Sequence, residues 1–165
     1  KLIIDVSYQS NKAKVVGGFF ENWEDEQLLK MTEKIVNNIQ EYIPGEFYKR
    51  ELPCIIEFLN EHDLKELEFT IIDGFTFLND DNKKGLGAYL FENLNKNIPI
   101  IGIAKTKFHN NTKNVIEIFR GESKKPLYIS SIGFDVIKAA ASIKKMHGNF
   151  RLPHLVKLVD TQTKK

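Results

Sequence analysis

The first twenty residues contain two apolar runs that are separated by only four polar residues. Residues 2–8 are rich in β-branched side chains, residues 9–12 are polar, and residues 13–20 are again apolar. Two such runs with a short polar connection predict an antiparallel β-hairpin. The fold must therefore begin with an antiparallel pair of strands.

Residues 27–40 allow two interpretations. Four apolar residues have the spacing of one helical face, whereas the β-branched content and the position directly after a hairpin favour a third strand. The four apolar residues are Leu28, Met31, Ile35 and Ile39.

The rest of the chain alternates between helical and strand patterns. Short apolar runs predict strands at 69–72, 99–104, 115–120 and 127–130, and helical spacing predicts helices at 46–62, 83–94 and 135–146. Pro53 should kink or interrupt the first of these helices, and Pro153 should begin a last one. This order predicts an α/β fold with a mixed sheet flanked by helices, in one domain over residues 1–165.

Composition narrows the function only a little. The chain has 165 residues, 42% of them hydrophobic, so it can bury a core without disulfides. Its net charge of +2 neither requires nor excludes nucleic acid. The single cysteine, Cys54, and the lack of a membrane-spanning apolar run indicate a cytoplasmic globular protein.

Three carboxylates are the best candidates for chemistry. Asp5 interrupts an apolar strand, where burial disfavours it, Asp73 ends another apolar strand, and Glu51 lies on the helix after a Pro-Gly turn. If the two strands are neighbours, these side chains could hold Mg²⁺ or Mn²⁺ for phosphodiester hydrolysis. Structural explanations also exist, because Asp73-Gly74 is a common turn pair and Glu51 could be a solvated charge.

Six blocks of the chain, in one collinear order, resemble the endonuclease V family. Residues 42–53 are similar to its tyrosine-x-proline-glycine segment with the arginine-glutamate pair downstream. Residues 4–8 and 72–74 resemble its two aspartate motifs, and residues 99–105 resemble its proline-x-isoleucine-glycine-valine-alanine-lysine motif. The two last blocks, residues 125–130 and 151–153, complete a match that covers almost the whole chain.

The resemblance implies a ribonuclease-H-like fold, a strand within residues 27–40, and Mg²⁺ as the cofactor, with Mn²⁺ able to substitute. It implies Asp5, Glu51 and Asp73 as metal ligands, and Lys105 facing the phosphate. It further implies a wedge beside a displaced base, with the base pocket near two glycines. The wedge would be Tyr42, Ile43 and Pro44, and the glycines Gly74 and Gly102. Such a wedge is physically reasonable, since a base must leave the stack to be read in a pocket.

Two departures from the family pattern concern the site. The family histidine near the last strand is absent from residues 130–135, and Asp135 could replace it or cap the following helix. The family's histidine-proline-arginine after the second aspartate is also absent, and Lys83 and Lys84 could contact phosphate instead. The resemblance thus predicts an endonuclease that acts 3′ of inosine in DNA or RNA. The alternative is a lesion-binding protein of the same fold that cleaves poorly.

Overall fold

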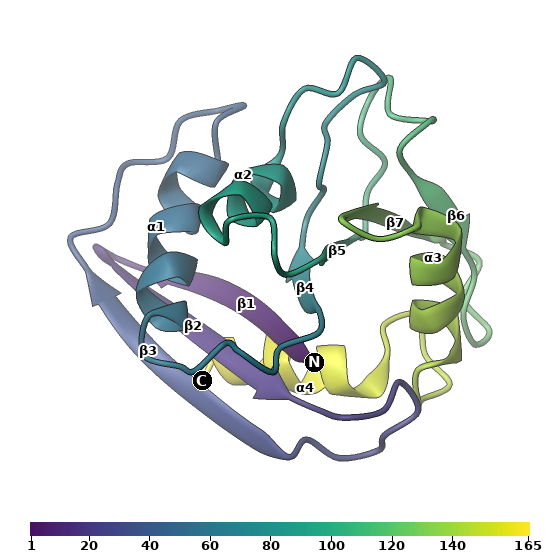
Figure 1. Cartoon of the computed structure of the whole chain (residues 1–165), viewed down its shortest axis with the longest axis horizontal. Helices are drawn as coiled ribbons and strands as arrows, with labels where there is room; N and C mark the ends of the chain where they lie inside the picture. Colours follow the sequence, from purple (N-terminus) through teal and green to yellow (C-terminus); the bar gives the residue numbers. More distant parts are fainter.

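One mixed seven-stranded sheet organises the molecule. The computed structural model describes all 165 residues, and Figure 1 shows the strands running through its middle. The strands are β1 (Leu2–Gln9), β2 (Lys12–Phe19), β3 (Lys30–Asn37), β4 (Thr70–Asp73), β5 (Ile100–Ala104), β6 (Ile116–Ile118) and β7 (Leu127–Ile132). Their order across the sheet is β3-β2-β1-β4-β5-β7-β6. The predicted α/β fold with a mixed sheet is confirmed.

The sheet is antiparallel at both sides and parallel in the middle. β1, β2 and β3 pair as an antiparallel meander, β1–β4 and β4–β5 are parallel, and β7 runs antiparallel to β5 and β6. In parallel neighbours the carboxyl ends point the same way, toward one edge of the sheet, so β4 ends beside the middle of β1, and β5 ends next to β4. This edge is the place where the sheet can gather side chains from strands that are remote in sequence.

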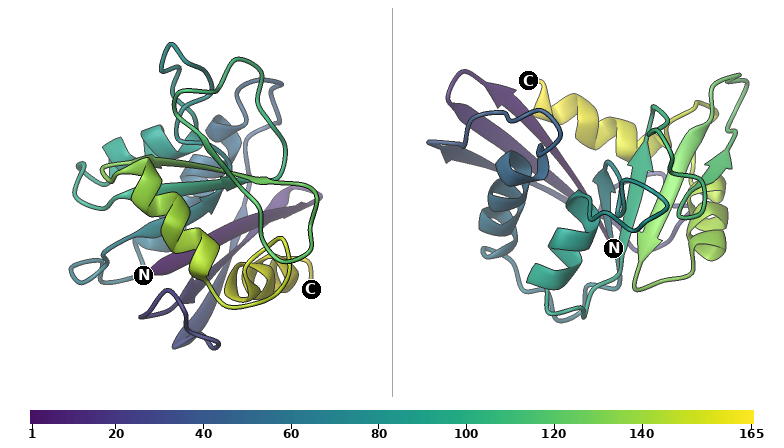
Figure 2. Two further views of the ribbon diagram at one scale, coloured as in Figure 1. Left: turned by 90° about the vertical axis from the view of Figure 1, so that its right-hand side faces the viewer. Right: turned by 90° about the horizontal axis from the view of Figure 1, so that it is seen from above.

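Four helices cover the two faces of the sheet. They are α1 (Tyr48–Leu59), α2 (Leu86–Asn93), α3 (Val136–Lys145) and α4 (His154–Thr163). Figure 2, right, shows α4 on the opposite side of the sheet from α1 and α2. None of the four helices combines the length and the hydrophobicity that crossing a bilayer requires.

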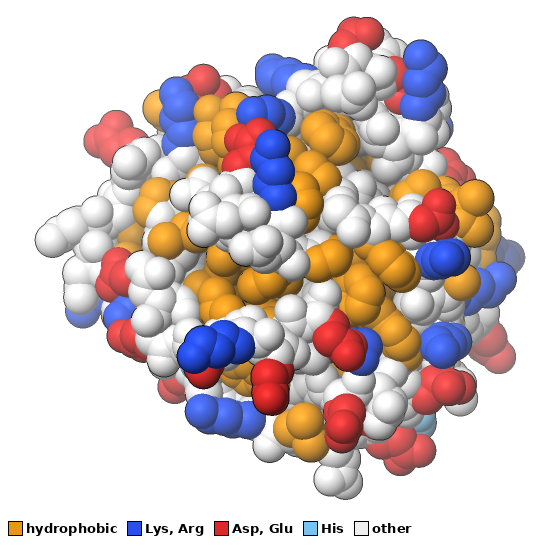
Figure 3. Space-filling view, viewed as in Figure 1, with side chains coloured by type: hydrophobic (Ala, Val, Ile, Leu, Met, Phe, Trp, Pro, Cys, Tyr) orange, Lys and Arg blue, Asp and Glu red, His pale blue; other side chains and the backbone are white.

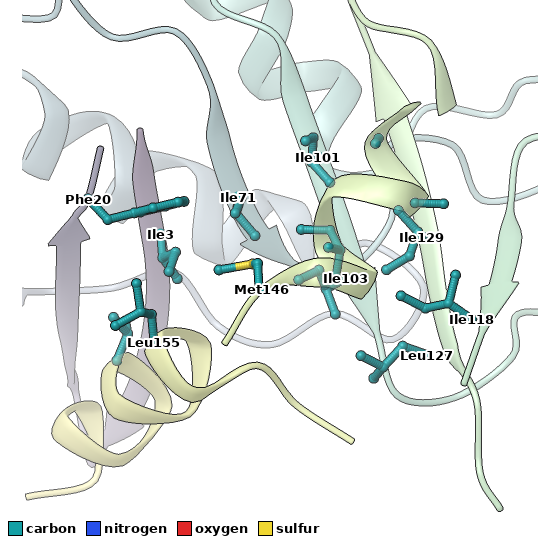
Figure 4. Packing of buried hydrophobic residues seen from close by; sticks show 14 of the residues in the cluster. Ile3, Phe20, Ile71, Ile101, Ile103, Ile118, Leu127, Ile129, Met146 and Leu155 are labelled. Carbon is teal, nitrogen blue, oxygen red and sulfur yellow. The ribbon is translucent and has the colours of Figure 1, made fainter. Parts of the chain in front are cut away.

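Alternation along the strands divides the core into two layers. Ile3 and Ile71 point to the side of α3 and α4, and Figure 4 shows them packed with Leu155 and Met146. Ile4 points to the other side, toward α1 and α2. Since successive residues of a strand face opposite sides, Asp5 and Asp73 share the α4 side with Ile3 and Ile71.

The ambiguous segment 27–40 is a strand. β3 pairs with β2 along its whole length, with Glu33 opposite Val16. The residues whose spacing suggested a helix are not a buried stripe, since Met31 is 38% exposed and Ile35 is 50% exposed. β3 lies at the edge of the sheet, which is why its apolar residues remain partly in solvent.

Several predicted boundaries were wrong. Pro53 neither ends nor interrupts α1; its ring faces solvent, and the helix begins only five residues before it. The helix expected from residue 83 begins at Leu86, because Lys84 forms a β-bridge with Phe77. The strand expected at 115–120 is only Ile116–Ile118, since Arg120 turns inward to bind backbone carbonyls.

Candidate functional site

Asp5 and Asp73 lie next to each other on neighbouring parallel strands. Ile4 of β1 pairs with Ile72 of β4, so the two aspartates are the next residues along each strand. The Asp5 carboxylate accepts a hydrogen bond from the Thr163 hydroxyl of α4 at 3.0 Å. The side chain of Asp73 is 48% exposed and faces the open edge. The structure thus brings together the two predicted aspartates.

Glu51 reaches the same region from the first turn of α1. It is only 6% exposed, and its side-chain hydrogen bond comes from the Tyr8 hydroxyl at 3.4 Å. The guanidinium of Arg50 stacks over the Tyr8 ring at 3.9 Å. A carboxylate in the first helical turn is favoured by the helix dipole, but a nearly buried one with a single long hydrogen bond is costly for the fold.

Lys105, directly after β5, provides the positive charge beside the aspartates. Its Nζ lies 3.5 Å from Asp73 Oδ2 and 3.5 Å from Asp160 Oδ1. Asp160 is only 6% exposed and also pairs with Lys157 and Lys164 of α4. Asp160 therefore has three lysines around it, one of which, Lys105, it shares with Asp73.

Asp160 was not among the residues that the sequence predicted. The sequence contains a weak indication of its role. Asp160 lies on the same helical face as Leu155 and Val159, which are both buried. An acidic residue on the buried stripe of an amphipathic helix is unusual. This pattern in the last helix could have marked Asp160 as a candidate.

The electrostatics separate the carboxylates into two groups. Burial, together with the charges of neighbouring carboxylates, raises the pKa of Asp5 and raises that of Glu51 well above its usual range. Burial would also raise the pKa of Asp160, but hydrogen bonds from Lys157 and Lys164 outweigh it and lower the pKa to about 2. Proton affinity is therefore high at Asp5 and Glu51 and low at Asp160.

A small cavity lies among these side chains. It has a volume of about 20 Å³ and is lined by Asp5, Asp73, Lys105 and Asp160 together with apolar residues of β1, β4, β5 and the α4 region. A space of this size admits about one water-sized group. The oxygen-only set of donors and the excess of buried negative charge suit a hard divalent cation.

The carboxylates do not yet form a ready-made metal centre. No three His, Cys, Asp or Glu side chains converge closely enough to hold an ion. Each carboxylate has a partner of its own instead: Thr163 for Asp5, Tyr8 for Glu51 and Lys105 for Asp73. Binding a cation here therefore requires side-chain rotation, chiefly of the exposed Asp73.

The predicted wedge is prominent on the surface. Tyr42 is 59% exposed, Ile43 is 46% exposed, and Pro44 is exposed as well. The Glu46 amide donates to the Ile43 carbonyl across Pro44 and Gly45, whose φ of +80° only glycine adopts easily. This turn fixes the apolar side chains in the loop between β3 and α1, seen at the upper left of Figure 1.

The two predicted pocket glycines have different structural roles. A Cβ on Gly102 would lie 2.3 Å from the Gly74 carbonyl oxygen, so Gly102 allows two backbones to approach closely. Gly74 has a φ of +125°, and a Cβ there would lie 3.9 Å from Phe47, next to the wedge loop. Of the two glycines predicted to line the base pocket, Gly74 has open space beside its Cα, whereas the backbone of Gly74 already fills the space beside Gly102.

The two predicted phosphate contacts differ in availability. The Lys84 ammonium is paired with Glu92 at 2.6 Å, so its charge is already compensated. Lys83 is exposed, and its side chain forms no ion pair. Only Lys83 remains free for the predicted contact.

Asp135 lies away from the other carboxylates, which corrects the suggestion that it binds metal. Its carboxylate accepts a hydrogen bond from the Lys138 amide at 2.9 Å and caps α3. The preceding strand ends at Ile132, which pairs with Ile100 at the start of β5. Asp135 therefore follows the opposite end of the sheet from Asp73, and the helix-capping alternative holds.

Solved structures share this fold at low sequence identity. Human ENDOV is 18% identical, with a TM-score of 0.79 over 99% of this chain and 82% of that one. Endonuclease V of Ciona intestinalis, in complex with a 24mer DNA containing an inosine followed by a ribo-adenosine, is 17% identical, with a TM-score of 0.80 over 99% and 83%. The Bacillus subtilis enzyme is 19% identical, with a TM-score of 0.71 over 99% and 77%.

Sequence comparison gives the family. No curated protein sequence matches significantly. The family model described as Endonuclease V matches residues 3–161, which include every carboxylate of the site. With this match over nearly its whole length, the chain belongs to the endonuclease V family of nucleases.

Proposed function

We propose that the protein is a Mg²⁺-dependent endonuclease that hydrolyses a phosphodiester 3′ of inosine in DNA or RNA, as a step in nucleic-acid repair. The observation that carries the proposal is the register that places Asp5 beside Asp73, with Glu51 and Lys105 at the same edge, in a chain of this family. The Ciona relative in complex with inosine-containing DNA supports the substrate. The cytoplasmic location stays a prediction.

Asp5, Glu51 and Asp73 would hold the cation, and Asp160 would add a fourth carboxylate. A bound Mg²⁺, or Mn²⁺ in its place, would supply an activated water and stabilise the charge on the leaving oxygen. Lys105, released from Asp73 as that side chain turns to the cation, would face the scissile phosphate. Positioning and charge stabilisation would then provide most of the rate.

The apolar wedge would act on the bases rather than on the phosphate. Tyr42 and Ile43 project from a turn that Pro44 and Gly45 hold in shape, so they can fill the gap that a displaced base leaves. The displaced base would enter beside Gly74, where the structure leaves space next to Phe47.

A lesion-binding protein with weak cleavage is the second candidate. Two observations favour it: residues 130–135 contain no histidine, and the carboxylates do not converge on one point without a cation. Against it stands Asp160, a buried carboxylate that lines the cavity together with Asp5 and Asp73.

Cleavage of end-labelled oligonucleotides distinguishes the two candidates. Strands with one inosine, made as DNA and as RNA, would be incubated with Mg²⁺, Mn²⁺ or EDTA. We expect one ion-dependent product 3′ of the inosine, absent with Asp73→Ala and retained with the control Asp63→Asn, a surface residue after α1. Binding without cleavage would support the second candidate, and neither binding nor cleavage would contradict both.

A further inference from the structure

A second groove continues from the carboxylate cavity. It has a volume of about 710 Å³ and shares Lys105 and Leu152 with the cavity that contains Asp5 and Asp73. This volume lies within the range of small-molecule sites, large enough for a nucleotide. Anything bound in the groove would therefore lie directly beside the group that occupies the carboxylate cavity.

The groove presents an aromatic ring that the fold leaves in solvent. Phe150 is 79% exposed, more than any other large hydrophobic residue of the protein. A single exposed apolar residue is ordinary. Phe150 is unusual because the backbone on both sides of it is held by hydrogen bonds and a close contact, so the loop that carries the ring keeps its position.

Arg120 holds that backbone. Its guanidinium is nearly buried and donates to the carbonyls of Phe150 at 2.8 Å and Gly148 at 3.1 Å, with further bonds to Lys144 and Met146. No carboxylate pairs with Arg120. A buried arginine that is satisfied entirely by carbonyl oxygens fixes the path of the chain around it.

A close backbone contact fixes the same segment from the other side. Gly121 has a φ of +56°, and a Cβ there would lie 1.9 Å from the Asn149 carbonyl oxygen. The turn after β6 is therefore pressed against the residue that precedes Phe150. The two loops that form the groove are held together, so the backbone of Phe150 has a fixed position and its exposed ring offers a platform for stacking.

The charge around the platform is positive. Lys105, Arg151 and Lys157 line the groove, and Glu122 is the one acidic residue there. The Arg151 guanidinium binds the carbonyls of Pro126 and Lys105 and so keeps its full charge. Asp160 compensates only part of the lysine charge, because it pairs with three lysines at once.

We propose that this groove binds one unpaired nucleotide of the substrate strand, adjoining the scissile phosphate, with its base stacked on Phe150. The inference rests on the proposed nuclease function. A fixed, exposed aromatic ring with cations beside it is the arrangement that holds single-stranded nucleic acid, since a base stacks on the ring and the phosphate meets the cations. Because Lys105 lines both spaces, the nucleotide in the groove would lie next to the phosphate that Lys105 faces.

Binding in EDTA tests the groove separately from cleavage. The affinity of wild type and Phe150→Ala for a fluorescent single-stranded oligonucleotide with one inosine would be measured by anisotropy. We expect Phe150→Ala to weaken binding about 10-fold, within the range for loss of one stacked base, and Phe150→Trp to restore it. The matched control is Phe119→Ala, which removes an exposed ring outside the groove and should change nothing.

An abasic scan identifies the nucleotide. Removing the base at one position next to the cleaved bond should weaken binding by wild type and have no further effect on Phe150→Ala. The groove proposal would be overturned if Phe150→Ala bound the oligonucleotide as tightly as wild type. It would also be overturned if no single abasic position weakened binding by wild type. Neither result would contradict the nuclease function. Absence of oligonucleotide binding by the wild type in EDTA would likewise overturn the groove proposal, and the cleavage assay with Mg²⁺ would still test the nuclease function separately.

Discussion

Replacing Glu51 by glutamine should stabilise the protein in the absence of metal. Glu51 is nearly buried, its one side-chain hydrogen bond is long, and burial together with the charges of Asp5 and Asp73 raises its pKa well above the usual range. The folded state therefore opposes the ionised form. Glutamine has the same shape, still accepts a hydrogen bond from Tyr8 and carries no charge.

The size of the gain follows from the link between pKa and stability. Each unit by which folding raises a pKa costs about 1.4 kcal/mol once the group is ionised, or about 3–5 °C in Tm for a chain of this length. Folding raises the pKa of Glu51 well above its usual range, so we expect Glu51→Gln to gain stability in EDTA at alkaline pH, by about 1.4 kcal/mol for each unit of that rise.

The pH dependence has a definite sign. The folded protein holds the Glu51 proton more tightly than the unfolded chain, so the wild type loses stability as pH rises from the unfolded pKa to the raised folded one. Below that range Glu51 is protonated in both states. The advantage of Glu51→Gln should thus be small near pH 5 and increase with pH.

Thermal denaturation in EDTA between pH 5 and pH 9 measures this difference. The matched control is Glu57→Gln on the same helix; Glu57 is 52% exposed and pairs with Lys34, so its replacement should give no gain. A Glu51→Gln variant no more stable than wild type at pH 8, or one whose advantage did not change with pH, would refute the reasoning.

Four further outcomes are expected. Mn²⁺ at 100 times its Kd should stabilise wild type by about 2.7 kcal/mol, measured as a rise in Tm, and should not stabilise Asp73→Asn; a shift retained in Asp73→Asn would contradict the site. Asp135→Ala should lose about 1 kcal/mol of stability as a lost helix cap and keep its metal-dependent cleavage, which the oligonucleotide assay checks. Gly102→Ala should lose about 1–3 kcal/mol in urea denaturation, because its Cβ meets the Gly74 carbonyl. Arg120→Met should lose at least about 3 kcal/mol in the same assay, since it removes several charged hydrogen bonds.

The elements of the fold could largely be predicted because local patterns determine them. The hairpin of residues 2–20 and the helices on both faces follow from periodicity, which reports the buried side of each element. The segment 27–40 stayed ambiguous for a physical reason: an edge strand leaves Met31 and Ile35 partly exposed, so no buried stripe marks its period.

The site depended on information that a local pattern does not contain. Asp5 and Asp73 become neighbours only through the pairing of β1 with β4, and the family resemblance, rather than spacing, indicated that pairing. The role of Asp135 could not be decided without the direction of β7. Because β7 runs antiparallel to β5, Asp135 lies at the opposite end of the sheet from Asp73. Asp160 was missed because three lysines gather around it only in the fold: Lys157 of its own helix, Lys164 directly after that helix and Lys105 after β5.

The hydrogen bond between Thr163 and Asp5 joins residues that are 158 positions apart. The ribosome therefore makes Asp5 158 residues before Thr163, and the whole sheet before α4. A nascent chain that had folded its whole sheet would still lack Asp160 and Thr163 at the carboxylate edge. The candidate site is therefore completed only after the sheet, when α4 has been made and has docked against β1.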